Sequence, residues 1–278
     1  MISDHIIVSE LITSAWKPLS QIPIILVATL IWLTASHWIW KKINREENQS
    51  VTHRPQAIIY FIIFFLIFVY SNIMHVTLFE MINDKENILF NSLIDIAVKM
   101  SAIIISVIIV KKLNLFFSKT QASTLRIFLV ALVGFALLYF IIYFAHIVNK
   151  DLLNNEFDEH PMIVKLSEST LDKNIFWLLA LSTVIITPIY EEIVFRGFLQ
   201  PATTTALGIH YGIVCQCLLF TLLHPKHTYL PIFIFALALS YTRQWSKSLW
   251  PGIMMHILLN GSTIATLYIQ NYGNPFAL

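Results

Sequence analysis

Three groups of polar residues stand late in this chain, each inside a segment that is otherwise strongly apolar. They combine carboxylate, guanidinium, imidazole and amide side chains with one phenylalanine: Glu191, Glu192 and Arg196; Phe220 and His224; His256 and Asn260. Ionisable groups at membrane depth are costly and usually face the interior of a helix bundle, where they mark functional sites. Three apolar segments that each contribute a glutamate, a histidine or an asparagine therefore predict a reaction centre.

The first group divides into a pair and a single carboxylate. On a helix Glu192 and Arg196 lie four residues apart on one face, so they can form an ion pair. Glu191 is rotated by about 100° from Glu192, which leaves its carboxylate free to act as a base. The alternative is a structural cluster in which all three charges join this helix to a neighbour.

The other two groups repeat the four-residue spacing. Phe220 can wall off a site into which His224 points, although His224 precedes Pro225 and can also cap its own helix. His256 and Asn260 place a ring N–H and an amide on one face, and two aligned donors suit a developing oxyanion. Their alternative role is hydrogen bonding between helices, which is common for these residue types in membranes.

The composition indicates a polytopic membrane protein. Of the 278 residues, 57% are hydrophobic and only 12% are charged, whereas a soluble domain carries about twice that share of charge. The formal net charge of +2 is too small to indicate a nucleic-acid partner, and no basic stripe with interleaved aromatic residues is present.

Eight segments approach the length of about 20 apolar residues that a spanning helix needs. They are Ile22–Trp40, Ala57–Leu78, Leu89–Val110, Leu125–Val148, Phe176–Leu199, Thr205–Leu223, Tyr229–Gln244 and Leu249–Ile269. The fifth is expected to continue beyond its apolar part. The predicted fold class is therefore all-α, a polytopic membrane helix bundle of about eight transmembrane helices.

The connections predict the orientation of the chain and the depth of the polar groups. Lys and Arg concentrate in Lys41–Arg54 and Lys111–Ser123, so these loops are expected on the cytoplasmic side. If the chain turns near Leu207–Gly208, Glu191 and His224 lie at nearly equal distances on either side of the turn. In an antiparallel helix pair they then share nearly the same depth.

The order EExxxR, FxxxH and HxxxN on consecutive late helices resembles the CPBP family. This family comprises type II CAAX prenyl endopeptidases together with bacteriocin-processing and immunity relatives, also called Abi proteins. The resemblance covers about Thr170–Ile269, and the earlier helices match only as hydrophobic spans. It implies that Glu191 and His224 activate water and that His256 and Asn260 stabilise the tetrahedral oxyanion.

A metal is a separate question within this resemblance, since the family is often described as metalloproteases. Two histidines and a glutamate suit zinc with an open position, so zinc is a candidate cofactor. The HExxH helix motif is absent, however, and a glutamate–histidine pair can activate water unaided. We favour a metal-independent reaction and assign no ligands.

The sequence thus predicts an intramembrane endopeptidase in three parts: family-divergent helices over 1–170, catalytic helices over 171–270 and a short tail over 271–278. The rivals are a non-catalytic bacteriocin-immunity or partner-binding scaffold and a proton-coupled transporter. The compact chain favours a bacterial cell membrane, with the lipid bilayer and a peptide or membrane-protein substrate as partners. Asp95 and Lys99 are expected to neutralise each other, and His75 is expected at the membrane interface.

Overall fold

The computed structural model describes residues 54–80, 88–113, 124–151 and 172–273. All regular structure in these ranges is helical, and it forms seven helices when consecutive helical segments are counted together. The predicted first span, Ile22–Trp40, lies outside the described residues. The all-α prediction is confirmed for the part of the chain that the structure describes.

The elements follow the predicted apolar segments closely. In chain order they are α2 (Arg54–Glu80), α3 (Ile88–Lys112), α4 (Thr124–Asp151), α6 (Lys173–Leu181), η1 (Ser182–Ile186), α7 (Thr187–Glu191), η2 (Glu192–Leu199), α8 (Gln200–Leu207), α9 (Ile209–Leu222), η3 (Lys226–Thr228), α10 (Tyr229–Ser246) and α11 (Trp250–Tyr272). Here η1 and η2 are π-helical and η3 is a single 3₁₀ turn.

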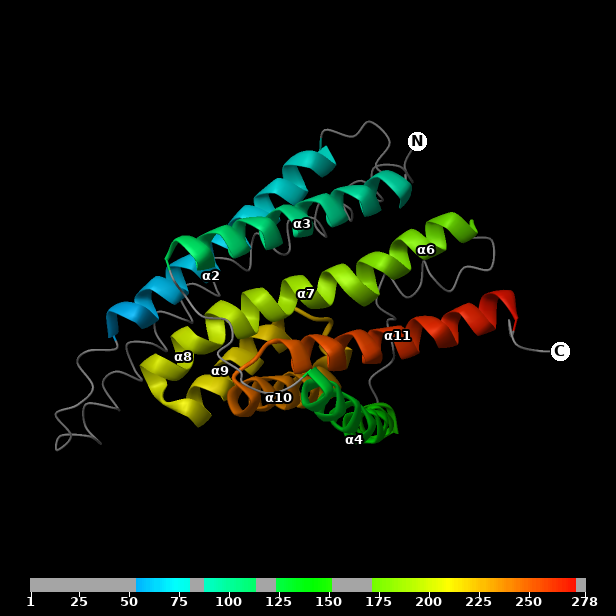
Figure 1. Ribbon diagram of the computed structural model, residues 1–278. Coiled ribbons are helices and arrows are strands. Elements are labelled where there is room, and N and C mark those ends of the chain that lie inside the picture. The colour runs from blue at the N-terminus through cyan, green and yellow to red at the C-terminus, as the bar shows by residue number, and fades with distance from the viewer. Residues whose placement is uncertain (1–53, 81–87, 114–123, 152–171, 274–278) are drawn as a thin grey trace.

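One long helix, from α6 to α8, runs through the middle of the bundle (Figure 1). Asp172 caps its start by accepting hydrogen bonds from the backbone N–H groups of Asn174 and Ile175. Each π-helical segment ends two residues before a proline, Pro188 or Pro201. Proline has no N–H to donate, so it disturbs the i→i−4 ladder in the turn before it. The prolines therefore account for the wider turns without ending the helix.

The long helix ends where the sequence predicts a turn. Gly208 has a φ of 81°, a conformation that L side chains rarely adopt, and α9 begins at the next residue. Gly212 then allows α9 to pass very close to α8, because a Cβ at this position would lie 2.4 Å from the Thr204 Cα atom. The two glycines together fold α9 back along the long helix.

The remaining helices pack around this hairpin. On one side α2 contacts η2 and α8, and α3 contacts η1 and α7; on the other, α11 contacts η1 and α7, while α10 packs between α9 and α4 (Figure 1). The largest core joins α2 to η2, where Phe64 and Phe195 meet edge to face with ring centroids 5.7 Å apart. A second core, built on Phe235, Leu239 and Met255, joins α4 to α10 and α11.

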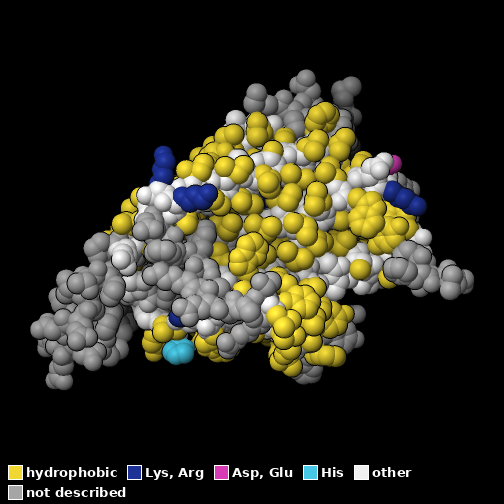
Figure 2. Space-filling model, viewed as in Figure 1, with side chains coloured by type: hydrophobic (Ala, Val, Ile, Leu, Met, Phe, Trp, Pro, Cys, Tyr) yellow, Lys and Arg dark blue, Asp and Glu magenta, His cyan; other side chains and the backbone are white. Residues whose placement is uncertain are grey.

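The outer surface suits a lipid environment. Four helical stretches are long and apolar enough to cross a membrane: Gln56–Glu80, Ile88–Lys112, Lys173–Leu207 and Trp250–Ile269. The face seen in Figure 2 is a broad field of hydrophobic side chains, with Lys and Arg side chains towards its edges. The chain is a multi-pass membrane protein. Four of the eight predicted spans thus qualify among the described residues, and the total of eight stays a prediction.

Candidate active site

Glu192 and Arg196 form an ion pair in the core of the bundle. The Arg196 Nη1 atom lies 3.1 Å from the Glu192 Oε1 atom, and both residues are 0% exposed. The guanidinium also donates to the Ala236 carbonyl at 3.4 Å and lies over the Phe220 ring, 4.5 Å from its centroid. The four-residue spacing predicts this pair, and its burial shows that Glu192 and Arg196 sit in a structural position without access to solvent.

His256 on α11 joins the two neighbouring glutamates. Its Nδ1 atom lies 3.3 Å from Glu192 Oε1, and its Nε2 atom lies 3.8 Å from Glu191 Oε2. An ionised carboxylate only accepts hydrogen bonds, so the Nδ1 atom carries a proton that it donates to Glu192. The Phe235 ring packs edge to face against the imidazole, with centroids 4.8 Å apart. The buried imidazole is therefore fixed in orientation, with its Nε2 atom directed at Glu191.

Phe220 and His224 form the wall on α9. The Phe220 ring meets Phe195 at 4.9 Å edge to face and His224 at 4.6 Å, measured between ring centroids. The His224 Nδ1 atom donates to the Phe220 carbonyl at 2.8 Å. This bond caps the last turn of α9 and leaves the Nε2 atom with a lone pair when the ring is neutral. Capping and availability as a base thus coexist in His224.

Asn260 reaches the long helix at its first π-helical segment. Its Nδ2 atom donates to the Thr183 carbonyl at 2.9 Å. The N–H of Thr187 bonds to Ser182 instead of Thr183, and the next residue, Pro188, has no N–H. The Thr183 carbonyl is therefore left without a donor from its own helix, and the amide on α11 satisfies it. His256 and Asn260 both face the long helix, as their spacing predicts.

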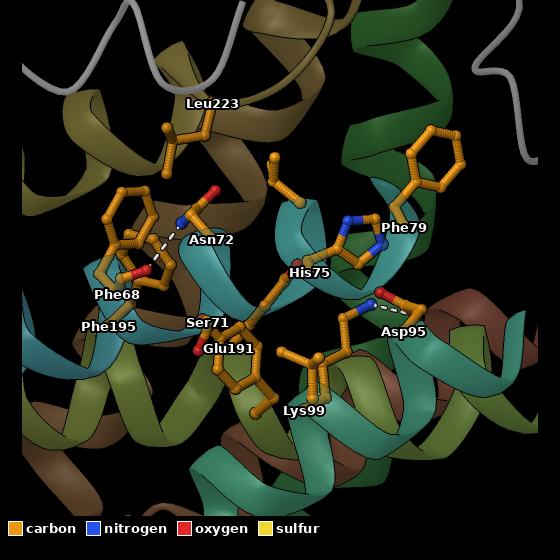
Figure 3. A pocket seen from close by; sticks show the side chains of 13 residues that line it. Phe68, Ser71, Asn72, His75, Phe79, Asp95, Lys99, Glu191, Phe195 and Leu223 are labelled. Carbon is orange, nitrogen blue, oxygen red and sulfur yellow. Dashed lines mark hydrogen bonds and ion pairs between the residues drawn. The ribbon is translucent and has the colours of Figure 1, made fainter. Parts of the chain in front are cut away.

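A cavity of about 430 Å³ opens beside Glu191, between the long helix, α2 and α3 (Figure 3). Its apolar wall includes Phe68, Phe79, Phe195 and Leu223, and its polar wall includes Asn72, His75, Asp95, Lys99 and Glu191. Leu223 immediately precedes His224, so the end of α9 and Glu191 lie at the same level of the bundle. The side chain of Glu191 is 20% exposed, whereas that of Glu192 is only 1% exposed. The two neighbouring glutamates therefore have different environments.

Asp95 and Lys99 pair on α3 and fasten it to the long helix. The Lys99 Nζ atom lies 2.7 Å from Asp95 Oδ2 and donates to the Thr187 hydroxyl at 2.8 Å. The Ser182 hydroxyl donates to the same Asp95 oxygen at 2.9 Å. The predicted neutral pair is confirmed. Its additional bonds bracket η1, so α3 holds the part of the helix where the backbone ladder is disturbed.

The structure thus brings some of the predicted residues into contact and leaves others apart. Glu191, Glu192, Arg196 and His256 form one cluster, and Arg196 connects it to Phe220. His224 makes no hydrogen bond or ion pair with Glu191 in the described part of the chain. Asn260 donates one of its two amide hydrogens to a backbone carbonyl.

This arrangement does not fit a zinc ligand set. The two histidines make separate contacts, one with Phe220 and one with the glutamates. Among the described residues, no three His, Cys, Asp or Glu side chains are grouped so that they could hold a metal ion.

The sequence analysis did not predict that α2 contributes side chains to the cavity. His75, expected at the membrane interface, lines the cavity together with Asn72, and its ring stacks on Phe79 at 6.5 Å. It also missed the Thr183 carbonyl as the partner of Asn260. For the Thr183 carbonyl, a signal was present in the sequence: Pro188 has no N–H to donate to the preceding turn. The distribution of apolar and polar residues along α2 does not indicate which face of this helix meets the site.

Part of the chain matches a known protein family. Residues 173–262 match the model of a protein family described as "Type II CAAX prenyl endopeptidase Rce1-like". No curated protein and no solved structure matches the chain. The matched segment begins at the first residue of α6, ends within α11 and contains all three polar motifs. The chain therefore carries, over residues 173–262, a domain of the Rce1-like type II CAAX prenyl endopeptidase family.

Proposed function

We propose that this protein is an intramembrane endopeptidase that hydrolyses a peptide bond in a membrane-associated peptide or protein. The observation that carries the proposal is the fixed imidazole of His256 between two glutamates, one buried and one facing a cavity. The cavity is large enough for a small ligand and lies among helices apolar enough to span a bilayer. A bacterial cell membrane is the proposed location.

In the proposed reaction Glu191 and His224 act on water. The Glu191 carboxylate accepts a proton from a water molecule in the cavity as the water oxygen forms a bond to the peptide carbonyl carbon. The free Nε2 atom of His224 provides the second acceptor for this water. When the tetrahedral intermediate collapses, the C–N bond breaks and the accepted proton is returned to the leaving amine. The products are a carboxylic acid and an amine.

His256 and Asn260 stabilise the negative oxygen of that intermediate in the same proposal. Glu192 holds the Nδ1–H of His256, and a second proton on Nε2 makes this atom a donor beside the Glu191 carboxylate. With that proton the charges of Glu191, Glu192, Arg196 and His256 sum to zero, which suits a poorly solvated site. The remaining amide hydrogen of Asn260 is the second donor. Donors fixed before the reaction stabilise developing charge without reorganisation.

The decisive test compares purified wild type with Glu191→Gln and His224→Phe in lipid nanodiscs, with a quenched fluorescent peptide library as substrate. Each variant keeps the shape of the side chain and removes the proton acceptor. We expect each to lower kcat/KM by about 10²–10⁴-fold, the usual contribution of general base catalysis. Melting curves serve as the control for folding.

Three outcomes separate the proposal from its rivals. Cleavage by wild type that is lost in both variants supports the endopeptidase. Near-normal turnover by either folded variant contradicts the assigned roles. If wild type cleaves nothing and a cellular immunity phenotype survives Glu191→Gln, the protein is a scaffold and the proposal is wrong.

A further inference from the structure

Two polar side chains of α2 face the cavity from outside the family-matched segment. Asn72 and His75 lie three residues apart on one face of the helix, and both line the cavity that holds Glu191. Residues 173–262 contain none of α2. This part of the cavity wall is therefore supplied by the chain before the matched segment.

The orientation of the Asn72 amide decides what it can bind. Its Nδ2 atom donates to the Phe68 carbonyl at 2.7 Å, one turn earlier in the same helix. The amide oxygen consequently points away from that carbonyl, towards Leu223 on the other side of the cavity (Figure 3). No described residue donates a hydrogen bond to this oxygen. Asn72 thus presents a neutral acceptor to a ligand.

His75 complements this acceptor. Its ring stacks on Phe79 and makes no hydrogen bond to any described residue, so its ring N–H remains available as a donor. Asn72 and His75 are separated by about 4.5 Å along the helix axis. An extended peptide advances about 3.3 Å per residue, so one or two residues of an unwound chain span both groups.

The charges around the cavity favour a neutral ligand. Asp95 and Lys99 neutralise each other at 2.7 Å, which leaves Glu191 as the remaining carboxylate on the wall. A negatively charged ligand is therefore disfavoured, and an ammonium group would pair with Glu191 instead of with the neutral Asn72 and His75. Backbone amides supply the neutral N–H and C=O groups that match Asn72 and His75.

We propose that Asn72 and His75 form a subsite for the main chain of an unwound peptide, with Asn72 accepting a backbone N–H and His75 donating to a backbone carbonyl. The aromatic rings of Phe68, Phe79 and Phe195 surround the apolar side chains of that peptide. This subsite rests on the proposed function and assigns its substrate recognition to α2. It selects extended, uncharged peptide segments over helical ones, whose backbone groups are already paired.

The experiment measures binding apart from cleavage. In the Glu191→Gln protein in nanodiscs, the affinity of a short fluorescein-labelled peptide of Val, Thr and Ser residues, which favours an extended conformation, is measured by anisotropy. We expect Asn72→Leu and His75→Phe each to weaken binding about two- to tenfold, the effect of one neutral hydrogen bond. Ile73→Ala, on the lipid side of α2 at 50% exposure, is the matched control.

A set of singly N-methylated peptides identifies the contact. Methylation of one particular peptide nitrogen should weaken binding to the parent protein and have no further effect on Asn72→Leu, because both changes remove the same hydrogen bond. Additive losses at every position would overturn the assignment. So would equal affinities of the Asn72→Leu, His75→Phe and Ile73→Ala variants, or a parent protein that binds no peptide. Peptide binding without cleavage by the wild type would contradict the proposed function and leave the subsite standing.

Discussion

Arg196→Met should destabilise the bundle far more than an ordinary ion-pair variant. Methionine replaces the apolar stem and removes the charge, which leaves the carboxylate of Glu192 without its guanidinium. Glu192 is 0% exposed, so water cannot replace the lost partner. Removal of one member of a buried pair costs about 3–5 kcal/mol, which is about two to four orders of magnitude in the unfolding equilibrium. The remaining bond from His256, at 3.3 Å, favours the lower part of that range.

A matched control exists on α3. Lys99 and Asp95 have the same four-residue spacing and a shorter contact of 2.7 Å, but both side chains are 21% exposed. Because both side chains are partly exposed, Lys99→Met should cost only about 1 kcal/mol, near the upper limit for accessible pairs. Burial, and not the length of the contact, is expected to decide the difference between the two variants.

The double variant Glu192→Met/Arg196→Met separates charge from packing. If a stranded carboxylate causes the loss, removing Glu192 as well should restore at least half of the stability that Arg196→Met loses. If the loss comes from the guanidinium stacked on Phe220 at 4.5 Å, the double variant should be no better than the single one.

The measurement is reversible unfolding in mixed micelles by titration with SDS, followed by tryptophan fluorescence. Arg196→Met within about 1 kcal/mol of wild type, the range of an accessible ion pair, would refute the reasoning. A double variant as unstable as the single one would show that packing dominates.

Further predictions concern helix packing, the oxyanion site and the metal. Gly212→Ala should prevent stable folding, because its Cβ would lie 2.4 Å from Thr204 Cα; Gly261→Ala, whose Cβ meets only Val184 Cγ1 at 3.6 Å, should melt like wild type. Asn260→Ala should lower kcat by about 10²–10³-fold with little change in KM, as for a donor that acts in the transition state; a change confined to KM contradicts that role. A chelator should leave the cleavage activity of the wild type intact. If the chelator abolishes activity, zinc restores it and the Asn260→Asp variant is active, the protein has a metal site instead.

Much of the fold follows from the sequence because a bilayer imposes a length on each apolar segment. The helices over 54–80 and 88–112 begin and end within a few residues of the predicted spans. Gly208 marks the turn because its positive φ suits glycine. The pairing of Glu192 with Arg196 is equally local, since four residues bring two side chains to one face of a helix.

The composition of the site depends on tertiary structure. His256 meets Glu191 and Glu192 across 64 or more residues of sequence, and Asn260 finds the Thr183 carbonyl on another helix. In a soluble protein the apolar stripe of a helix indicates its buried face. In a membrane the outer face is apolar as well, so the sequence of α2 does not reveal which side meets lipid. Only the packing of α2 against the long helix directs Asn72 and His75 into the cavity and Ile73 outward.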